Sequence, residues 1–242
     1  MRRDGRRPDE LRPLKIEPDY IEQAHGSALI SCGKTIVLCT ATVDQSVPRW
    51  MSGRGTGWMT AEYGLLPAST GERTPRETGK QKGRTVEIQR LIGRALRAVT
   101  DFEALGERTV WLDCDVLQAD GGTRSAGISG AWVAAARALD RFGLSRALPE
   151  SIAAVSLGIV EGEPLLDLDY AEDSSADVDL NVAMTGSGRL VEVQATAERA
   201  PFDRDQFNEL LELAAAGIEQ IATAQRAAVE LTVSSDGGNR PA

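Results

Sequence analysis

Apolar residues occur at every second position through much of the first seventy residues of the chain. Four segments there alternate apolar and polar residues between glycines and prolines, which is the pattern of half-buried β-strands. They read LKIEPDYI, SALISC, KTIVLCTATV and GWMTAEYGLLP, in this order. We expect these segments to pair as antiparallel strands.

A polar loop and a helix follow. Residues 69–83, STGERTPRETGKQKG, contain no aliphatic or aromatic side chain and cannot contribute to a core, so they predict an exposed basic loop. The next segment, RTVEIQRLIGRALRAVTDF, repeats its apolar residues at helical spacing. The buried face that this spacing predicts consists of Ile88, Leu91, Ile92, Ala95, Leu96 and Val99.

A strand that runs directly into a helix is predicted around residue 120. In TVWLDCDVLQA, the apolar residues Val110, Leu112, Cys114 and Val116 occupy alternate positions and form one buried face. The segment ADGGTRSAGISGA then places two glycines in front of a helix of small residues. We expect this helix to pack tightly on a sheet and to end at Gly143.

The rest of the chain predicts a second set of strands and a long helix. Strand patterns occur in IAAVSLGIV, PLLDLDYA, LNVAMTG and LVEVQATA, joined by hairpins, and an amphipathic helix follows with Asp203 as its cap. Strands followed by a helix thus occur about twice, which predicts an α+β fold with pseudo-duplicated βα halves, although no sequence repeat proves the duplication. We expect one domain over residues 1–234 and a disordered tail over residues 235–242.

Composition and charge narrow the class of protein. The chain has 242 residues, 42% of them hydrophobic, which is enough for a sizeable core, and its longest apolar run is too short to cross a bilayer. The three cysteines are odd in number and lack CxxC spacing, which favours buried, reduced thiols in a cytoplasmic protein. The net charge of −9 argues against binding nucleic acid over the whole surface. Residues 1–97 nevertheless carry 17 Lys and Arg against 11 Asp and Glu, so they can form a local track for a polyanion.

The turn GGTRSAGISG has the features of an anion site. The first amides of a helix lack partners within it and carry partial positive charge, and Gly121 and Gly122 allow a ligand to approach the backbone. Thr123 can cap the helix or donate its hydroxyl, and Arg124 offers two parallel donors to a phosphate. A plain tight turn is the alternative. The pattern GxxxxGK[ST] is absent, so the site would lack the lysine of a nucleotide-binding loop.

The acidic run DLDYAEDSSADVD offers several carboxylates. Asp173 and Asp179 flank a Ser-Ser turn, and Asp177 and Asp179 share a face at i, i+2. Such carboxylates can hold a hard cation such as Mg²⁺ or act as a general acid. A solvated acidic hairpin is the alternative. Combined with an anion site, the carboxylates favour phosphoryl transfer.

The single histidine excludes several kinds of site. Ser-His-Asp triads, histidine-rich zinc sites and two-histidine ribonuclease chemistry gain no support from His25 alone, so we expect it to be structural. The four tryptophans are expected to pack rather than to stack on bases. In the basic loop, Arg73, Arg76, Lys80 and Lys82 form either a solvated face or contacts to phosphate groups.

Five stretches of the chain, taken together, form a highly specific pattern. They read RRDGRRPDELRP, GWMTAEYGLLPAST, GRTVEIQRLIGRALRA, LDCDVLQADGGTRSAGISGA and LDYAEDSSADVDLNVAMTG, and they cover nearly the whole chain. In this order and at these separations they resemble the ribonuclease PH family of phosphate-dependent 3′-to-5′ exoribonucleases. The resemblance implies a ribonuclease PH-like fold, also described as ribosomal protein S5 domain 2-like, with mixed sheets and packed helices.

The resemblance also implies roles for individual residues. It places inorganic phosphate, the attacking co-substrate, at a site made of Arg84, Gly122, Thr123, Arg124 and Ser125. Asp173 and Asp179 would be the catalytic residues and would bind Mg²⁺ or Mn²⁺. Arg73 and Arg76 would guide RNA along the exposed loop.

The function implied by the resemblance is removal of 3′-terminal nucleotides from RNA as nucleoside 5′-diphosphates, with the reverse addition also accessible. Trailers of tRNA precursors are the expected substrate, and a homo-hexamer built as a trimer of dimers is the expected assembly. A catalytically silent RNA-binding ring subunit and a hydrolytic metal-dependent exonuclease are the alternatives. The chain has Ala68 where many relatives have arginine, and its loop between Arg76 and Arg84 is slightly short. Both departures bear on the RNA track rather than on the chemistry.

Overall fold

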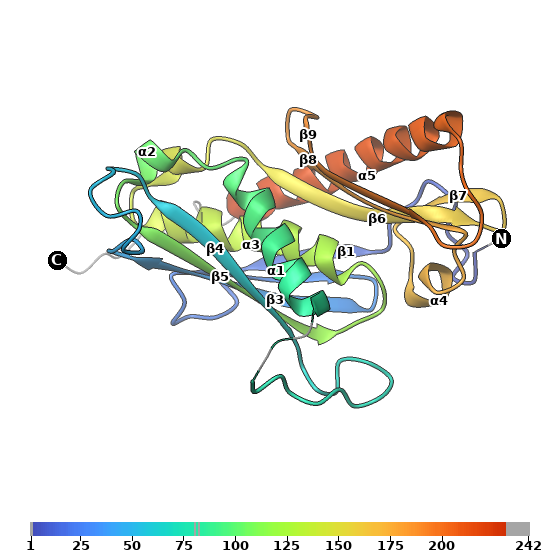
Figure 1. Cartoon of the computed structure of the whole chain (residues 1–242), viewed down its shortest axis with the longest axis horizontal. Coiled ribbons are helices and arrows are strands. Elements are labelled where there is room, and N and C mark those ends of the chain that lie inside the picture. The colour runs from blue at the N-terminus through green and yellow to red at the C-terminus, as the bar shows by residue number, and fades with distance from the viewer. Residues whose placement is uncertain (1, 80, 82, 231–242) are drawn as a thin grey trace.

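Two β-sheets, with helices packed between and beside them, make up the computed structural model, which describes residues 2–79, 81 and 83–230 (Figure 1). The first sheet has five strands in the order β1-β2-β3-β5-β4. These strands are β1 (Leu14–Pro18), β2 (Gly26–Cys32), β3 (Thr35–Asp44), β4 (Trp58–Leu65) and β5 (Thr109–Gln118). Each lies in a segment where the alternating pattern predicts a strand.

One strand direction differs from the prediction. Strands β1, β2, β3 and β5 pair in antiparallel fashion, but β4 lies parallel to β5, with Trp58 beside Thr109 and Leu65 beside Val116. The cause is the connection between the two strands. Helix α1 (Gly83–Arg97) forms a crossover that returns the chain to the sheet in the same direction. The first sheet is therefore mixed.

Helices α1 and α3 (Thr123–Arg141) pack on this sheet and bury the predicted apolar positions. The six residues predicted to face the core along α1 and just beyond it are at most 5% exposed, and the four alternating residues of β5 are fully buried. Helix α3 contacts both sheets, and its small residues allow this close packing. A Cβ atom on Gly130 would lie 2.7 Å from the Sγ atom of Cys39, so glycine is required there. Two short helices, α2 (Phe102–Leu105) and a 3-10 turn (Ser145–Ala147), complete this part.

The second sheet is antiparallel throughout, with the order β7-β6-β8-β9. Its strands are β6 (Ile152–Val160), β7 (Glu163–Leu166), β8 (Val178–Thr185) and β9 (Leu190–Ala197). Helix α5 (Arg204–Glu230) packs on this sheet, and the Asp203 carboxylate accepts the amides of Asp205 and Gln206 at 2.9 Å, which confirms the predicted cap. We call the chain through α3 the first half and the chain from β6 onward the second half.

The predicted strand PLLDLDYA is only half correct. Strand β7 ends at Leu166, because Asp167 adopts a left-handed backbone conformation with φ of 53°. Asp169 then caps a short helix, α4 (Tyr170–Asp173), in a capping box with Glu172. The acidic run is thus a helix and a turn ahead of β8, not a hairpin of two strands.

The amino-terminal segment joins the two halves through buried arginines. The Arg2 guanidinium donates to the Glu172 carboxylate at 2.7 Å, and that of Arg12 donates to the Asp167 carboxylate at 2.6 Å. All four side chains are buried. The pattern of charges, glycine and proline in this segment suggested no such burial.

The cysteines and the histidine are placed as the sequence predicts, and the tryptophans are so only in part. All three cysteines are free, with Cys39 and Cys114 buried and Cys32 half-buried. His25 is structural, since its Nδ1 atom accepts the amide of Val43. Trp132 packs in the core and Trp50 packs edge-on against Trp58, with ring centroids 5.0 Å apart, whereas Trp111 is exposed.

The described part of the chain contains no helix with the length and apolar composition needed to cross a membrane. The tail predicted over residues 235–242 lies outside the described residues.

Candidate active site

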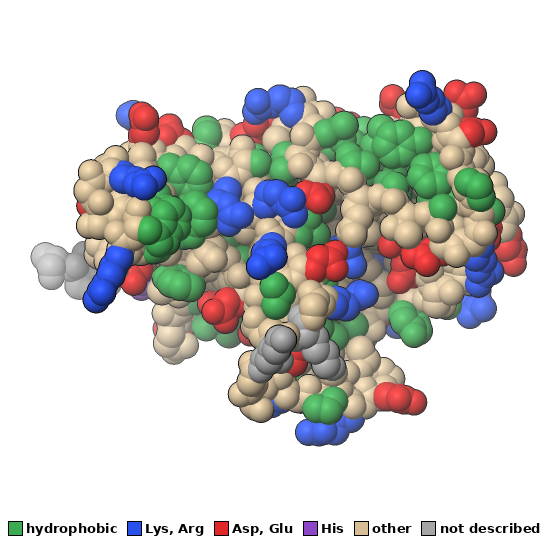
Figure 2. Space-filling model, viewed as in Figure 1, with side chains coloured by type: hydrophobic (Ala, Val, Ile, Leu, Met, Phe, Trp, Pro, Cys, Tyr) green, Lys and Arg blue, Asp and Glu red, His purple; other side chains and the backbone are tan. Residues whose placement is uncertain are grey.

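A cavity of about 770 Å³ lies where the two halves meet, and it contains most of the predicted site residues. Figure 2 shows basic and acidic side chains close together across the middle of this face, above the projecting loop. Seven of the nine predicted residues line the cavity: Arg73, Arg84, Gly122, Thr123, Arg124, Asp173 and Asp179. Ser125 and Arg76 do not line it.

The double glycine forms a tight turn that presents a helix amino terminus to the cavity. Gly121 and Gly122 both have positive φ, of 77° and 65°. A Cβ atom on Gly121 would lie 2.6 Å from the carbonyl oxygen of Leu168, so the turn packs directly against the segment that enters α4. The first amide to bond within α3 is that of Ala126, at 3.0 Å from the Gly122 oxygen. The preceding amides therefore carry the positive end of the helix, as an anion site requires.

Arg12 supports this turn through hydrogen bonds and an ion pair. Its guanidinium donates to the carbonyl oxygen of Asp120 and, in a two-pronged pair, to both carboxylate oxygens of Asp167. Thr35 supports the same turn, since its hydroxyl donates to the Gly121 oxygen at 2.6 Å and accepts the Asp120 amide at 2.9 Å. The sequence contains no local signal for Arg12, because its partners lie more than 100 positions away.

A tyrosine that the sequence patterns did not single out orients the threonine of the turn. The hydroxyl of Tyr63, on β4, lies 2.8 Å from that of Thr123. Burial raises the pKa of Tyr63, so its hydroxyl keeps its proton at neutral pH. This contact fixes the direction in which the Thr123 hydroxyl can serve a ligand.

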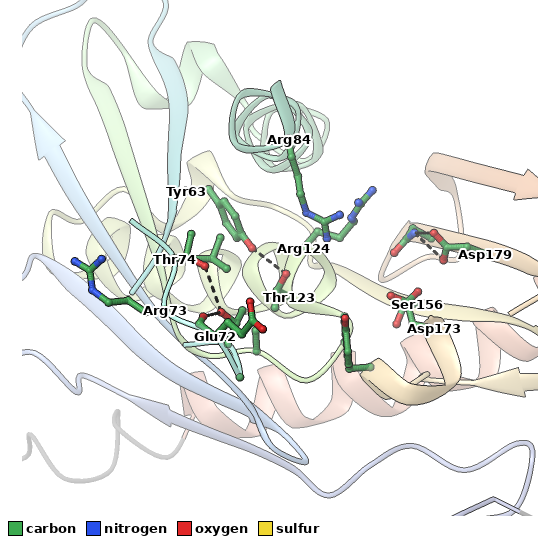
Figure 3. Close-up of a pocket in the computed structure, with 18 of the residues that line it drawn as sticks. Tyr63, Glu72, Arg73, Thr74, Arg84, Thr123, Arg124, Ser156, Asp173 and Asp179 are labelled. Atoms are coloured by element: carbon green, nitrogen blue, oxygen red, sulfur yellow. Dashed lines mark hydrogen bonds between the residues drawn. The ribbon is translucent and has the colours of Figure 1, made fainter. Parts of the chain in front are cut away.

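Two arginines project into the same part of the cavity. Arg84 extends from the first turn of α1 and Arg124 from the first turn of α3, and Figure 3 shows their guanidinium groups side by side. Arg124 is held in place, since it donates to the Gln194 side chain at 2.7 Å and lies 3.4 Å from the Glu87 carboxylate. Arg84 is exposed and free to meet a ligand.

Two carboxylates of the second half face these arginines. Asp173 ends α4 and Asp179 lies on β8. Burial and then the charge of Asp173 raise the pKa of Asp179 to about 6, while Arg124 and Arg84 oppose the rise. Burial also raises the pKa of Asp173, again opposed by Arg84 and Arg124. All four charged groups therefore share one electrostatic environment.

The carboxylate pair fits a divalent cation whose coordination is completed by oxygens of the substrate. Mg²⁺ is commonly held by one or two carboxylates together with phosphate oxygens and water. Asp173 and Asp179 supply such oxygen donors, and the described residues contain no group of three or more His, Cys, Asp or Glu that could hold a metal alone. Asp177, which was expected on the same face, is not among the residues that line the cavity.

The remaining predicted residues lie at the margins. The Ser125 hydroxyl is buried without a hydrogen-bond partner in the described part of the chain, and Ser125 does not line the cavity. Arg73 lines the cavity, but in Figure 3 its guanidinium points away from Arg84 and Arg124. Arg76 lines a neighbouring cavity of about 240 Å³. The described part of the loop is exposed as predicted except at Ser69, which is buried, and Thr74, which is half-buried; its two lysines lie outside the described residues.

The sequence of the chain matches one protein family over most of its length, in two consecutive parts. Residues 10–139 match the model of the 3′ exoribonuclease family, domain 1, and residues 150–217 match that of domain 2. The chain belongs to this family, the ribonuclease PH family. The prediction of a single domain over residues 1–234 stays a prediction.

Solved structures have the same fold. Rrp46 of rice (Oryza sativa) is 20% identical with a TM-score of 0.77, over 95% of this chain and 100% of that one. A chain of the Archaeoglobus fulgidus exosome with RNA bound to the active site is 25% identical with a TM-score of 0.76, over 92% and 91%. A chain of an archaeal exosome core is 24% identical with a TM-score of 0.74, over 92% and 90%. These similarities confirm the predicted ribonuclease PH-like α+β fold.

Proposed function

We propose that this protein is a phosphorolytic 3′-to-5′ exoribonuclease, which transfers the 3′-terminal nucleotide of RNA to inorganic phosphate. One observation carries the proposal. A single cavity holds a helix amino terminus and two arginines on one side, and two carboxylates of raised pKa on the other. Membership of a 3′ exoribonuclease family supplies the RNA 3′ end as the substrate.

The cationic side favours phosphate over water as the nucleophile. Phosphorolysis brings two anions together, the free phosphate and the last phosphodiester, against their mutual repulsion. Arg84, Arg124 and the amides of the Gly122 turn supply a compensating positive field that is already in place. A hydrolase would activate water and would need no second anion site.

The reaction balances without any other reactant. An oxygen of inorganic phosphate attacks the 5′ phosphorus of the terminal nucleotide, and the bond from that phosphorus to the preceding 3′ oxygen breaks. The products are a nucleoside 5′-diphosphate and an RNA one nucleotide shorter, whose 3′ oxygen takes up a proton. Because the phosphodiester bond that breaks is replaced by a phosphoanhydride bond in the product, nucleotide addition from diphosphates is also accessible.

The residues of the chain divide these tasks. Arg84, Arg124 and the Thr123 hydroxyl bind and orient the phosphate, and Tyr63 fixes the threonine. Asp173 and Asp179 would hold Mg²⁺ or Mn²⁺, which when bound neutralises charge on the phosphoryl oxygens. Without a bound metal, burial and the charge of Asp173 raise the pKa of Asp179 to about 6.

The proposed assembly and substrate are those that the resemblance to the ribonuclease PH family implies. Solved exosome chains have this fold, one of them in a complex with RNA bound to the active site. Beyond the RNA and ring-like assembly of these relatives, we propose that the chain forms a homo-hexamer, as a trimer of dimers, and trims the 3′ trailers of tRNA precursors. A silent ring subunit is a weaker candidate here, because both arginines and both aspartates are present and share one cavity.

The deciding experiment incubates an RNA that carries labelled phosphates throughout its backbone with the protein and Mg²⁺, with and without inorganic phosphate. We expect nucleoside 5′-diphosphates only with phosphate. Arg124→Ala should lower this rate by roughly 10²-fold or more, as does removal of one charge-stabilising donor in other enzymes. Arg90→Ala is the matched control, since Arg90 is exposed on α1 and does not line the cavity. Monophosphates formed without phosphate would establish hydrolysis instead, and RNA binding without cleavage would establish a silent subunit.

A further inference from the structure

The cavity contains one aromatic side chain that the phosphate chemistry does not explain. Tyr170, the first residue of α4, lines the cavity and is 65% exposed. Its hydroxyl makes no hydrogen bond to any described residue. An exposed ring at the mouth of a polar cavity has no role in the core, so it is available to a ligand.

Tyr170 is carried on a fixed support beside the reacting groups. It lies three residues before Asp173 on the same short helix. The capping box between Asp169 and Glu172 closes this helix, and Glu172 is anchored by its buried ion pair with Arg2 at 2.7 Å. The backbone at Tyr170 also packs on the glycine turn, since its nitrogen lies 3.0 Å from the position of a Cβ atom on Gly121. Stacking on such a ring requires little ordering of the protein.

The other aromatic residue that lines the cavity has a different role. Among the described lining residues, only Tyr63 and Tyr170 are aromatic. Tyr63 is 4% exposed and its hydroxyl is committed to Thr123, so its ring faces cannot receive a ligand. Tyr170 is therefore the one described ring in the cavity with accessible surface.

We propose that Tyr170 is a stacking platform for a base of the RNA beside the scissile bond, an inference that rests on the proposed function. Cleavage of the last phosphodiester places one nucleotide on each side of the reacting phosphorus. The charged groups of the cavity and the glycine turn interact with the phosphates of the RNA and with the free phosphate. None of them contacts the flat faces of the bases. An exposed aromatic ring stacks on any base, so Tyr170 strengthens RNA binding without selecting a sequence.

The test compares three substitutions at Tyr170 by two readouts. Steady-state phosphorolysis gives separate KM values for RNA and phosphate, and fluorescence anisotropy without phosphate gives the Kd for a labelled single-stranded RNA. Tyr170→Ala should raise the KM and Kd for RNA about five- to hundred-fold, the range of one base–aromatic stack, and leave the KM for phosphate unchanged. Tyr170→Phe should retain wild-type values, and Tyr170→Leu should resemble Tyr170→Ala. Tyr20→Ala is the control, because Tyr20 is 52% exposed and does not line the cavity.

RNAs that lack one base identify the partner of the ring. Removing the terminal or the penultimate base should weaken binding to the wild type at one of these positions, and Tyr170→Ala should abolish that difference. The proposal is overturned if Tyr170→Ala leaves RNA binding unchanged, if Tyr170→Leu retains wild-type affinity, or if the loss is equal for intact and base-less RNA. Because anisotropy requires no turnover, absence of diphosphate release would refute the proposed function while the stacking result still stands on its own.

Discussion

The two halves of the molecule contribute opposite charges to one cavity. The first half supplies cations and a helix amino terminus, through Arg84, Arg124 and the glycine turn. The second half supplies the carboxylates Asp173 and Asp179, on α4 and β8. Each half has its own sheet, but neither contains a complete site. The chemistry of this fold therefore depends on how the halves are joined.

The halves are joined by more than the apolar packing of α3. Arg12 of the first half binds both Asp167 of the second half and the carbonyl oxygen of Asp120 beside the turn. Gly121 also lies directly against the backbone at Leu168. These contacts connect the anion turn to the segment that carries the carboxylates, and they can be broken one at a time.

Breaking the buried ion pair should have the largest effect. Asp167→Asn leaves the Arg12 charge buried with a neutral partner, which we expect to cost about 3–5 kcal/mol of the free energy of unfolding. Asparagine suits the test because it tolerates the positive φ at this position. Urea unfolding measures the loss. The exposed Lys15–Glu17 pair is the control, and Glu17→Gln should cost less than about 1 kcal/mol. Equal losses in the two variants would show that the buried pair does not hold the halves together.

Removing one carboxylate of the second half should affect kcat, whereas removing one arginine of the first half should affect the KM for phosphate. Asp173→Asn should lower kcat about 10²-fold, a typical loss for one group that acts in the transition state, without raising the KM for phosphate. Arg84→Ala should raise that KM. Steady-state kinetics with varied phosphate measures both constants. Asp177→Asn is the matched control, since Asp177 belongs to the same acidic run but does not line the cavity. A raised KM for phosphate in Asp173→Asn would contradict this division.

A methyl group between the halves should have an intermediate effect. Gly121→Ala adds a Cβ atom 2.6 Å from the Leu168 oxygen at a residue with positive φ, whereas Gly188→Ala meets a similar φ but nothing within 4 Å. Both variants carry backbone strain of about 1 kcal/mol, and the clash adds about 1–3 kcal/mol to the first alone. Thermal unfolding of the two variants isolates the clash as a difference in Tm. Identical Tm values would mean that the turn and α4 separate freely.

The smallest expected effect is on the pH dependence of stability. The pKa of Asp179 is raised from 3.8 to about 6, so the folded protein binds more protons than the unfolded chain between about pH 4 and 6. The contribution of Asp179 to the free energy of unfolding is fully present below about pH 4 and is lost as the pH rises through about 6. Asp179→Asn removes this dependence, so its Tm should rise relative to that of the wild type across this window and stay constant above it. A constant Tm difference from pH 4 to 7, measured without metal, would contradict the raised pKa.

Periodicity in the sequence predicts most elements of this fold but not how they pair. The alternating pattern in β4 specifies which side chains are buried and is the same for a parallel and an antiparallel partner. The direction follows only when α1 is recognised as the crossover between β4 and β5. The strand predicted over PLLDLDYA failed at Asp167, where a charged side chain in a left-handed conformation leaves the sheet to meet Arg12.

Residues of the site could be predicted where a short stretch of sequence contains the chemical signal. A double glycine before a helix and a cluster of aspartates can be recognised in a short segment, whereas Arg84 was assigned only through the resemblance to the family; seven of the nine predicted residues line one cavity. Arg12 and Tyr63 were not recognised, because each acts on a partner at least 60 residues away. Ser125 was predicted from its place in the motif, but the helix turns its hydroxyl into the interior.

The contact of Arg12 with Asp120 and Asp167 also sets an order of events on the ribosome. Synthesis proceeds at about 5–20 residues per second, so the amino-terminal arginines emerge many seconds before the last of their partners. Until residue 167 has left the exit tunnel, the turn lacks the ion pair that supports it. A chain that ends before residue 167 therefore lacks the ion pair that supports the glycine turn, and the cavity is complete only after Asp173 and Asp179 have also been synthesised.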